Sequence, residues 1–139
     1  MITVIKSPFV QYKLTILRNK KTSNTVFRQT MNEISYLIAS DVLQYVPFKK
    51  QTIETPLKKM SGTALGQPII LVPILRAGLG LLEGFAKFLP EAEKGHIGLY
   101  RDEQTYEPVE YLFKLPRVKN KKVLILDPCL LYTSDAADE

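Results

Sequence analysis

The chain has 139 residues, of which 45% are hydrophobic, and its 19 basic and 14 acidic residues give a formal net charge of +5. This length and composition predict one globular domain, or part of one, and exclude a generally disordered protein. One cysteine, Cys129, and one histidine, His96, exclude a disulfide framework and the usual zinc sites. The sequence has neither a membrane-span-length apolar stretch nor a signal-peptide pattern, so we expect a cytoplasmic protein.

The basic residues are spread along the chain and occur only as short pairs, such as Lys49-Lys50 and Lys121-Lys122. A nucleic-acid-binding protein typically gathers its cations on one face or stripe, and no basic stripe interleaved with aromatic residues is present. We therefore rank nucleic-acid binding behind a surface that attracts small anionic substrates.

The first half of the chain is predicted to form two helices and then a small arm. One helix is expected over residues 9–18, and a longer one from Ser23 or Asn24 to about Val46, before Pro47. Residues 48–67 contain strand-like stretches interrupted by Pro56, with a turn at residues 60–63, and predict an antiparallel arm outside the main sheet. The residues leave open whether this arm makes subunit contacts or is a plain surface hairpin.

Residues 68–90 are the stretch around which the chain is organised. The apolar run 69–72 is too short for a helix and predicts a strand buried on both faces, with helices on either side. Arg76 and a glycine-bearing turn follow, and residues 81–89 then keep the helical period until Pro90. We expect free amides at the start of this helix to suit a phosphate, with Arg76 as a clamp. A tight turn with a surface arginine is the simpler alternative.

Two further short strands are predicted at residues 96–100 and 123–126, with residues 109–115 pairing back as a hairpin strand. The first ends in Arg101, and the second runs into Asp127. If the three buried strands are parallel neighbours, Arg76, Arg101 and Asp127 converge on the sheet edge where ligands bind in open α/β sheets. Two cations and a carboxylate suit a phosphate ester, with the carboxylate on ribose hydroxyls or a metal-bound substrate.

Three segments of the chain resemble the bacterial-type uracil phosphoribosyltransferases: residues 72–80 (VPILRAGLG), 98–109 (GLYRDEQTYEPV) and 123–128 (VLILDP). The resemblance runs from Pro8 to Pro128. It implies an α/β fold of the type I phosphoribosyltransferase kind: a parallel sheet flanked by helices, truncated here, with N-terminal helices and a small antiparallel arm. The implied reaction is pyrimidine salvage by a pentosyltransferase, in which uracil and phosphoribosyl pyrophosphate (PRPP) give UMP and pyrophosphate.

The resemblance also implies roles for particular residues. Arg76 and Arg101 match positions that contact PRPP, and Asp127 matches the start of the PRPP loop, where its carboxylate faces the ribose hydroxyls. Asp127 is therefore the candidate catalytic residue. Mg²⁺ is implied as an ion bound with PRPP, without a metal ligand assigned in this chain. A homo-oligomer, usually a dimer, is implied for the full-length protein, and GTP is left open as an effector.

After Pro128 the resemblance collapses within a few residues, and only Leu130 still agrees with the family's loop. The family's loop reads Asp-Pro-Met-Leu-Ala-Thr-Gly-Gly-Ser, whereas this chain has Thr133 and Ser134 at the two glycines and Asp135 at the serine. Residues 130–139 (LLYTSDAADE) look like translated sequencing-adapter sequence. We therefore expect residues 1–128 to be the N-terminal part of a phosphoribosyltransferase domain and residues 129–139 to be a non-native tail.

The family's C-terminal uracil-binding segment, which contains Gly-Asp-Ala, has no match in this chain, so no uracil-binding residue is assigned. The chain as written is expected to be an inactive fragment. The alternatives are a catalytically dead nucleotide-binding regulator and an RNA-binding regulator, each built on a phosphoribosyltransferase core.

Overall fold

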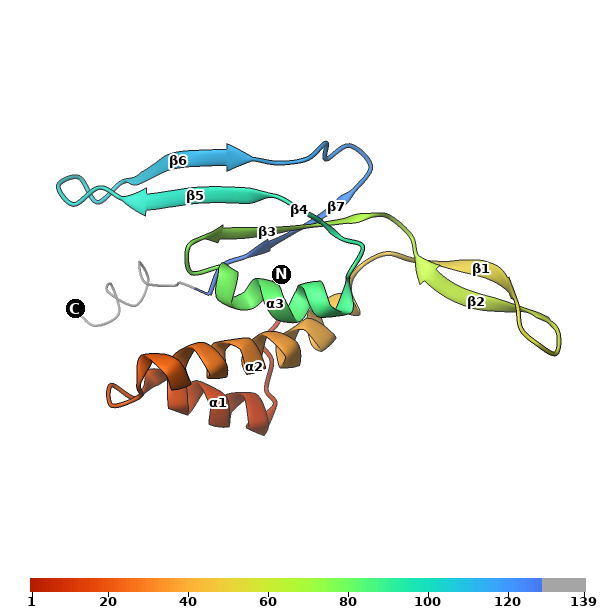
Figure 1. The fold of residues 1–139 in the computed structure, drawn as a ribbon, viewed down its shortest axis with the longest axis horizontal. Helices are drawn as coiled ribbons and strands as arrows, with labels where there is room; N and C mark the ends of the chain where they lie inside the picture. The colour runs from red at the N-terminus through yellow and green to blue at the C-terminus, as the bar shows by residue number, and fades with distance from the viewer. Residues whose placement is uncertain (129–139) are drawn as a thin grey trace.

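The computed structural model describes residues 1–128, which form a central sheet, three helices on one side of it and a two-stranded arm (Figure 1). The helices are α1 (Pro8–Arg18), α2 (Asn24–Leu43) and α3 (Leu79–Phe88). The strands are β1 (Phe48–Glu54), β2 (Lys59–Leu65), β3 (Ile69–Leu75), β4 (Glu93–Lys94), β5 (His96–Arg101), β6 (Pro108–Lys114) and β7 (Lys122–Leu126). The α/β class expected from the sequence is confirmed.

The main sheet is centred on β3. On one edge β3 pairs in parallel with β7, from Ile69 opposite Lys122 to Pro73 opposite Leu126. On its other edge β3 pairs in parallel with two strands in succession. Ile70 and Leu71 pair with β4, and Ile74 and Leu75 pair with β5. Because β6 pairs antiparallel with β5, the sheet is mixed, and the expected hairpin strand is confirmed.

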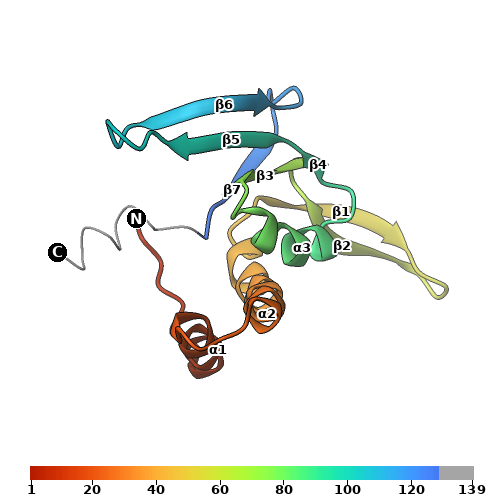
Figure 2. The same ribbon diagram turned by 60° about the vertical axis from the view of Figure 1, so that its left-hand side comes forward.

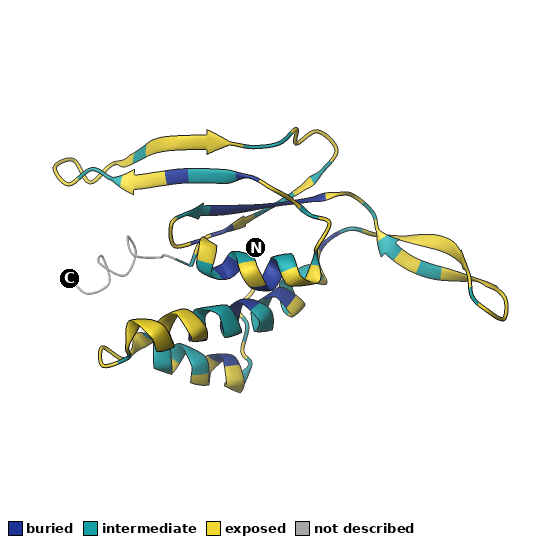
Figure 3. Cartoon of the chain, viewed as in Figure 1, coloured by how far each residue is buried: buried dark blue, intermediate teal, exposed yellow. Residues whose placement is uncertain are grey.

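Strand β3 is the most deeply buried element, as Figure 3 shows. Ile70, Leu71 and Val72 have no exposed surface. Leu81 and Phe85 of α3 belong to the same buried cluster as Leu71, so the helix covers one face of the strand. The sequence predicts helices on both faces, but within residues 1–128 all of them lie on one side of the sheet (Figure 2).

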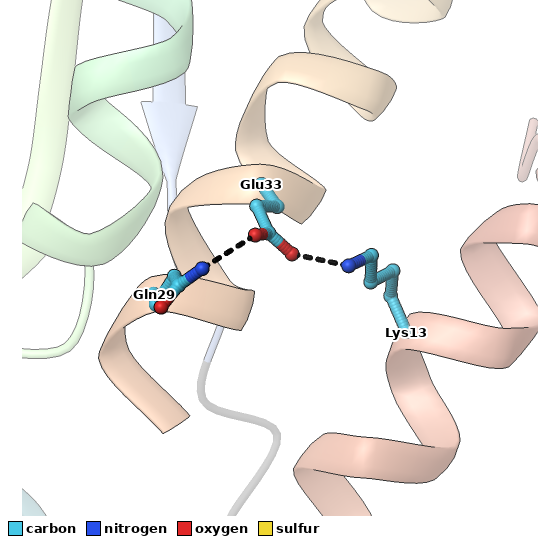
Figure 4. Close-up of polar contacts among 3 residues, drawn as sticks. All are labelled: Lys13, Gln29 and Glu33. Atoms are coloured by element: carbon cyan, nitrogen blue, oxygen red, sulfur yellow. Dashed lines mark hydrogen bonds and ion pairs between the residues drawn. The ribbon is translucent and has the colours of Figure 1, made fainter. Parts of the chain in front are cut away.

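Helix α1 is held to α2 by a charged contact (Figure 4). The Nζ atom of Lys13 lies 2.5 Å from Oε2 of Glu33, and Nε2 of Gln29 donates a 3.0 Å hydrogen bond to Oε1. The hydrogen bond from Lys13, and then the one from Gln29, lowers the pKa of the Glu33 carboxyl below its ordinary value.

Among residues 1–128, none of the helices has the length and apolar character of a membrane span.

Helix α2 begins as predicted but ends early. The Ser23 side chain accepts a hydrogen bond from the Val26 amide, which caps the first turn. The helix stops at Leu43, short of the predicted end near Val46. The amides of Tyr45 and Val46 bond to carbonyls three residues back, so the chain tightens before Pro47 and the helix cannot continue.

The predicted arm is confirmed as an antiparallel pair of β1 and β2 that projects away from the body (Figures 1 and 2). The predicted position of its turn is wrong, since residues 60–63 lie within β2. The chain reverses at residues 55–58 instead. There the Thr55 hydroxyl accepts hydrogen bonds from the amides of Leu57 and Lys58, and Pro56 has no amide to give to the strand ladder.

Candidate functional site

The carboxyl ends of β3, β5 and β7 meet at one edge of the sheet, next to the start of α3 (Figure 1). Arg76 is the first residue after β3, Arg101 is the last residue of β5, and Asp127 is the first residue after β7. The parallel arrangement expected from the sequence is therefore present. All three residues belong to the edge at which ligands bind in open α/β sheets.

The strand registers place the three residues at different heights along this edge. Asp127 is one step past Leu126, which pairs with Pro73, so it stands level with Ile74. Arg76 is two residues farther along the strand direction. Arg101 is three residues past Gly98, which pairs with Leu75, and therefore reaches the farthest beyond the sheet. A ligand that contacts all three must extend across this staggered edge, as a phosphorylated sugar with a second phosphate group can.

The turn between β3 and α3 differs from the sequence expectation of free helix amides. The four amides at its end bond to carbonyls of the same turn at 2.7–3.1 Å: Gly78 to Ile74, Leu79 to Arg76, Gly80 to Ala77 and Leu81 to Gly78. These amides are therefore already satisfied and cannot cradle a phosphate without rearrangement. The Arg76 side chain is exposed, and the peptide bond before it is cis. Attraction for an anion at this turn comes mainly from the Arg76 guanidinium.

The hairpin tip after Arg101 is fixed by Asp102, a residue for which the sequence predicts no role of its own. Its Oδ1 atom accepts hydrogen bonds from the amides of Thr105, at 2.8 Å, and Gln104, at 2.9 Å. The bond from Thr105 first, and then that from Gln104, lowers the pKa of the Asp102 carboxyl. Tyr106 completes the tight turn with a φ of 58°. Aspartate side chains commonly accept hydrogen bonds from backbone amides two and three residues later, so an aspartate directly after a strand is the sequence signal for such a turn.

The acidic groups of residues 1–128 form no metal site, and one cavity lies away from the candidate site. No group of three His, Cys, Asp or Glu side chains in residues 1–128 could hold a metal ion. A cavity of about 440 Å³ lies at the opposite end of β3, where Leu65, Gln67, Ile69 and Phe88 line it. It is therefore remote from the edge that carries Arg76. The differences from the family's loop at Thr133, Ser134 and Asp135 lie outside the described residues.

Comparison with known proteins gives one consistent result. Residues 4–137 match the family described as uracil phosphoribosyltransferase. The chain is 46% identical over 129 residues to a protein of that name from Levilactobacillus brevis, an alignment that covers 91% of this chain and 62% of the relative. It is 41% identical over 140 residues to a uracil phosphoribosyltransferase from Mycoplasmopsis agalactiae, covering 99% of this chain and 67% of the relative.

A solved structure, that of the AQ2163 protein from Aquifex aeolicus, matches the fold with a TM-score of 0.84 at 31% identity. The match covers 99% of this chain and 69% of that chain. The aligned part of this chain spans 62% of the length of the Levilactobacillus brevis protein, so the chain is shorter than the relatives that it matches.

Proposed function

The chain belongs to the uracil phosphoribosyltransferase family, and on this premise we propose that it is part of an enzyme that converts uracil and PRPP to UMP and pyrophosphate. The observation that carries the proposal is the placement of Arg76, Arg101 and Asp127 at the ends of three neighbouring parallel strands. Two permanent cations suit the phosphates of PRPP, and the carboxylate suits the ribose hydroxyls.

The reaction needs charge stabilisation more than a nucleophilic side chain. As the bond between ribose C1 and pyrophosphate breaks, its electron pair leaves with the pyrophosphate and C1 gains positive charge. Uracil N1 forms the new bond to C1 and loses its proton. Arg76 and Arg101 would stabilise the departing anion, and the Asp127 carboxylate would favour the charge that develops on the ribose.

Mg²⁺ is proposed to arrive with PRPP, where it neutralises phosphate charge. Residues 1–128 offer no group of three metal-ligating side chains. We therefore propose that phosphate oxygens of PRPP supply most of the ion's ligands, and we assign no residue of this chain as a metal ligand. Hard oxygen donors of this kind are what Mg²⁺ prefers.

We also propose that the arm is a subunit contact rather than a plain surface hairpin, and that the full-length protein is a homo-oligomer. All seven residues of β1 are exposed, and Leu57 at the arm's turn is 95% exposed. A two-stranded hairpin is only marginally stable by itself in water. A second subunit would cover its apolar side chains, among them Ile53 and Met60.

Residues 129–139 are proposed to be a non-native tail on an N-terminal fragment, and the chain as written is proposed to be inactive. Resequencing the locus through codon 128 tests the tail directly. A genomic reading frame that encodes residues 129–139 and then stops would overturn this proposal.

The test of function is turnover of uracil and PRPP to UMP with Mg²⁺, run on this chain and on the full product of the recovered reading frame. Activity only in the longer product supports both the family activity and the fragment. Activity in neither, with PRPP still bound, would instead favour a nucleotide-binding regulator. Salt-sensitive binding to a defined RNA without turnover would favour the RNA-binding alternative.

A further inference from the structure

Gly78 lies in the turn between β3 and α3, where this turn touches the end of β7. It is buried, although Arg76 and Ala77 before it are exposed and Leu79 after it is 46% exposed. Its φ of −60° and ψ of −21° are ordinary helical values that any residue adopts. The backbone conformation therefore gives no reason for a glycine at this position.

The reason is space. A Cβ atom at position 78 would lie 2.5 Å from the Ile74 nitrogen and 2.7 Å from the Ile74 oxygen, and closer still to the Leu126 carbonyl oxygen. All three are backbone atoms, so none can rotate away as a side chain would. Leu126 is the last residue of β7 and is only 4% exposed, and Asp127 follows it directly.

We propose that Gly78 is a positioning residue for the candidate site. Its missing side chain lets the turn that carries Arg76 rest directly on the end of the strand that carries Asp127. Any side chain at position 78 must push these two backbones apart, which changes the spacing of the arginine and the carboxylate together. The ligand-binding part of this inference rests on the proposed function, whereas the contact itself does not.

Two other glycines provide matched controls. A Cβ at Gly80 would lie 2.7 Å from Cγ of Met31, a flexible side chain that can move aside. Gly62, in the arm, has only ordinary contacts, the nearest at 3.5 Å from Ile53. Gly80→Ala therefore reports crowding near the same turn without contact to β7, and Gly62→Ala reports the general effect of the substitution.

The first measurement is hydrogen exchange in the 139-residue chain and its three alanine variants. Gly78→Ala is expected to speed exchange of the amides at residues 125–127 as well as at residues 78–80. Gly80→Ala should affect α3 and the part of α2 around Met31, and leave residues 125–127 unchanged. Unchanged exchange at residues 125–127 in a folded Gly78→Ala variant would overturn the proposal. If that variant does not fold, hydrogen exchange in the parent chain tests the proposal instead. The amides of residues 78–80 and of residues 125–127 should then have the same free energy of opening and the same dependence of that energy on denaturant. A difference in either quantity overturns the proposal.

The second measurement is binding of magnesium pyrophosphate by calorimetry. Gly78→Ala should weaken binding between about tenfold and a hundredfold, because small misplacements of binding groups have effects of this size. Gly80→Ala should lower thermal stability with at most about a twofold change in affinity, since Met31 can adjust. Equal losses of affinity in both variants would mean that Gly78 has only a packing role. If the parent chain fails to bind pyrophosphate, the ligand-binding part of this inference fails for this chain. The turnover test on the full product of the reading frame then decides the proposed function, and hydrogen exchange decides the contact.

Discussion

Strands β1 and β3 have the same length of seven residues, yet every residue of β1 is exposed and the first five of β3 are buried. The difference follows from sequence and pairing. β3 (IILVPIL) is apolar throughout and has partners on both edges, while β1 (FKKQTIE) is mostly polar and pairs with β2 alone. Two-edge pairing and coverage by a helix make β3 a rigid support, and one-edge pairing leaves β1 available to another molecule.

The two regions therefore contribute to function in different ways. The rigid strand ends in Arg76, so the position of this cation along the strand is set by the core of the molecule. The arm carries none of the three candidate site residues. Substitutions should separate the two regions, with stability and ligand binding depending on β3 and its neighbours, and association depending on the arm.

The largest expected effect is on the core. Leu71→Ala removes a fully buried side chain from β3 and should lower the free energy of unfolding by about 2–5 kcal/mol. Met60→Ala in the arm, where the side chain is 45% exposed, should change it by no more than about 0.5 kcal/mol. Urea denaturation of the two variants makes the measurement. Similar losses would mean that the arm is part of the stable core.

The next effect is on ligand binding. Arg76→Ala should weaken binding of magnesium pyrophosphate between about tenfold and a hundredfold, since hydrogen bonds between charged groups are worth about 1.5–3 kcal/mol each. The melting temperature should hardly change, because the Arg76 side chain is exposed. Arg18→Ala, on α1, is the matched control. Unaltered affinity in Arg76→Ala, measured by calorimetry, would remove this residue from the site.

A smaller effect is expected on association. Leu57→Glu places a charge at the turn of the arm and should weaken self-association by about tenfold, the effect of roughly 1.4 kcal/mol lost from an apolar contact. Tyr106→Glu, at the tip of the other hairpin and 68% exposed, is the control that should leave association unchanged. Sedimentation velocity over a concentration series measures both. Identical behaviour of the two variants would argue against the arm as a subunit contact.

The smallest effect is on acid stability. Hydrogen bonds from Lys13 and Gln29 lower the pKa of Glu33 in the folded chain. The Glu33 carboxylate therefore contributes its full stabilisation of the fold when the pH is above its unfolded pKa. It is lost as the pH falls through the lower folded value. Glu33→Gln should therefore reduce the melting temperature slightly near neutral pH, and the two proteins should converge in acid. Glu54→Gln, in the arm, is the control, and a difference that persists in acid would contradict this assignment.

The sequence predicts strands β3, β5 and β7 of the main sheet well because a short, mostly apolar run marks each of them. Of the three strands expected to be buried, only β3 is buried along most of its length, whereas β5 and β7 have one buried residue each and Ile125 is 64% exposed. Within residues 1–128 the helices cover only one side of the sheet (Figure 2), so the expectation of burial is wrong for these two strands. Arg76, Arg101 and Asp127 stand out by their positions at the strand ends.

The sequence also predicts the arm, but it favours a turn at Gly62 instead of at Thr55 and Pro56. Glycine suits many turns, whereas the hydroxyl of Thr55 settles this one by accepting hydrogen bonds from the amides two and three residues later, a weaker local signal than that of an aspartate.

The site is harder to predict than the fold. A glycine-bearing turn before a helix often exposes the helix amides, so the sequence predicts free amides at the start of α3. Here the carbonyls of Ile74 and Arg76 turn back to accept them, a detail set by the three-dimensional path of the turn. The packing of Gly78 against Leu126 is also beyond prediction, since it joins residues distant in sequence.

The pairing of β3 has a consequence for the order in which the protein can be made. Ile69 finds its partner Lys122 only after α3 and the whole β5–β6 hairpin have been synthesised. Until then, one edge of the most apolar strand has no neighbour as the nascent chain leaves the ribosome. Such an exposed edge is prone to pair with other chains. The nascent protein would therefore depend on chaperones most strongly between the emergence of β3 and that of β7.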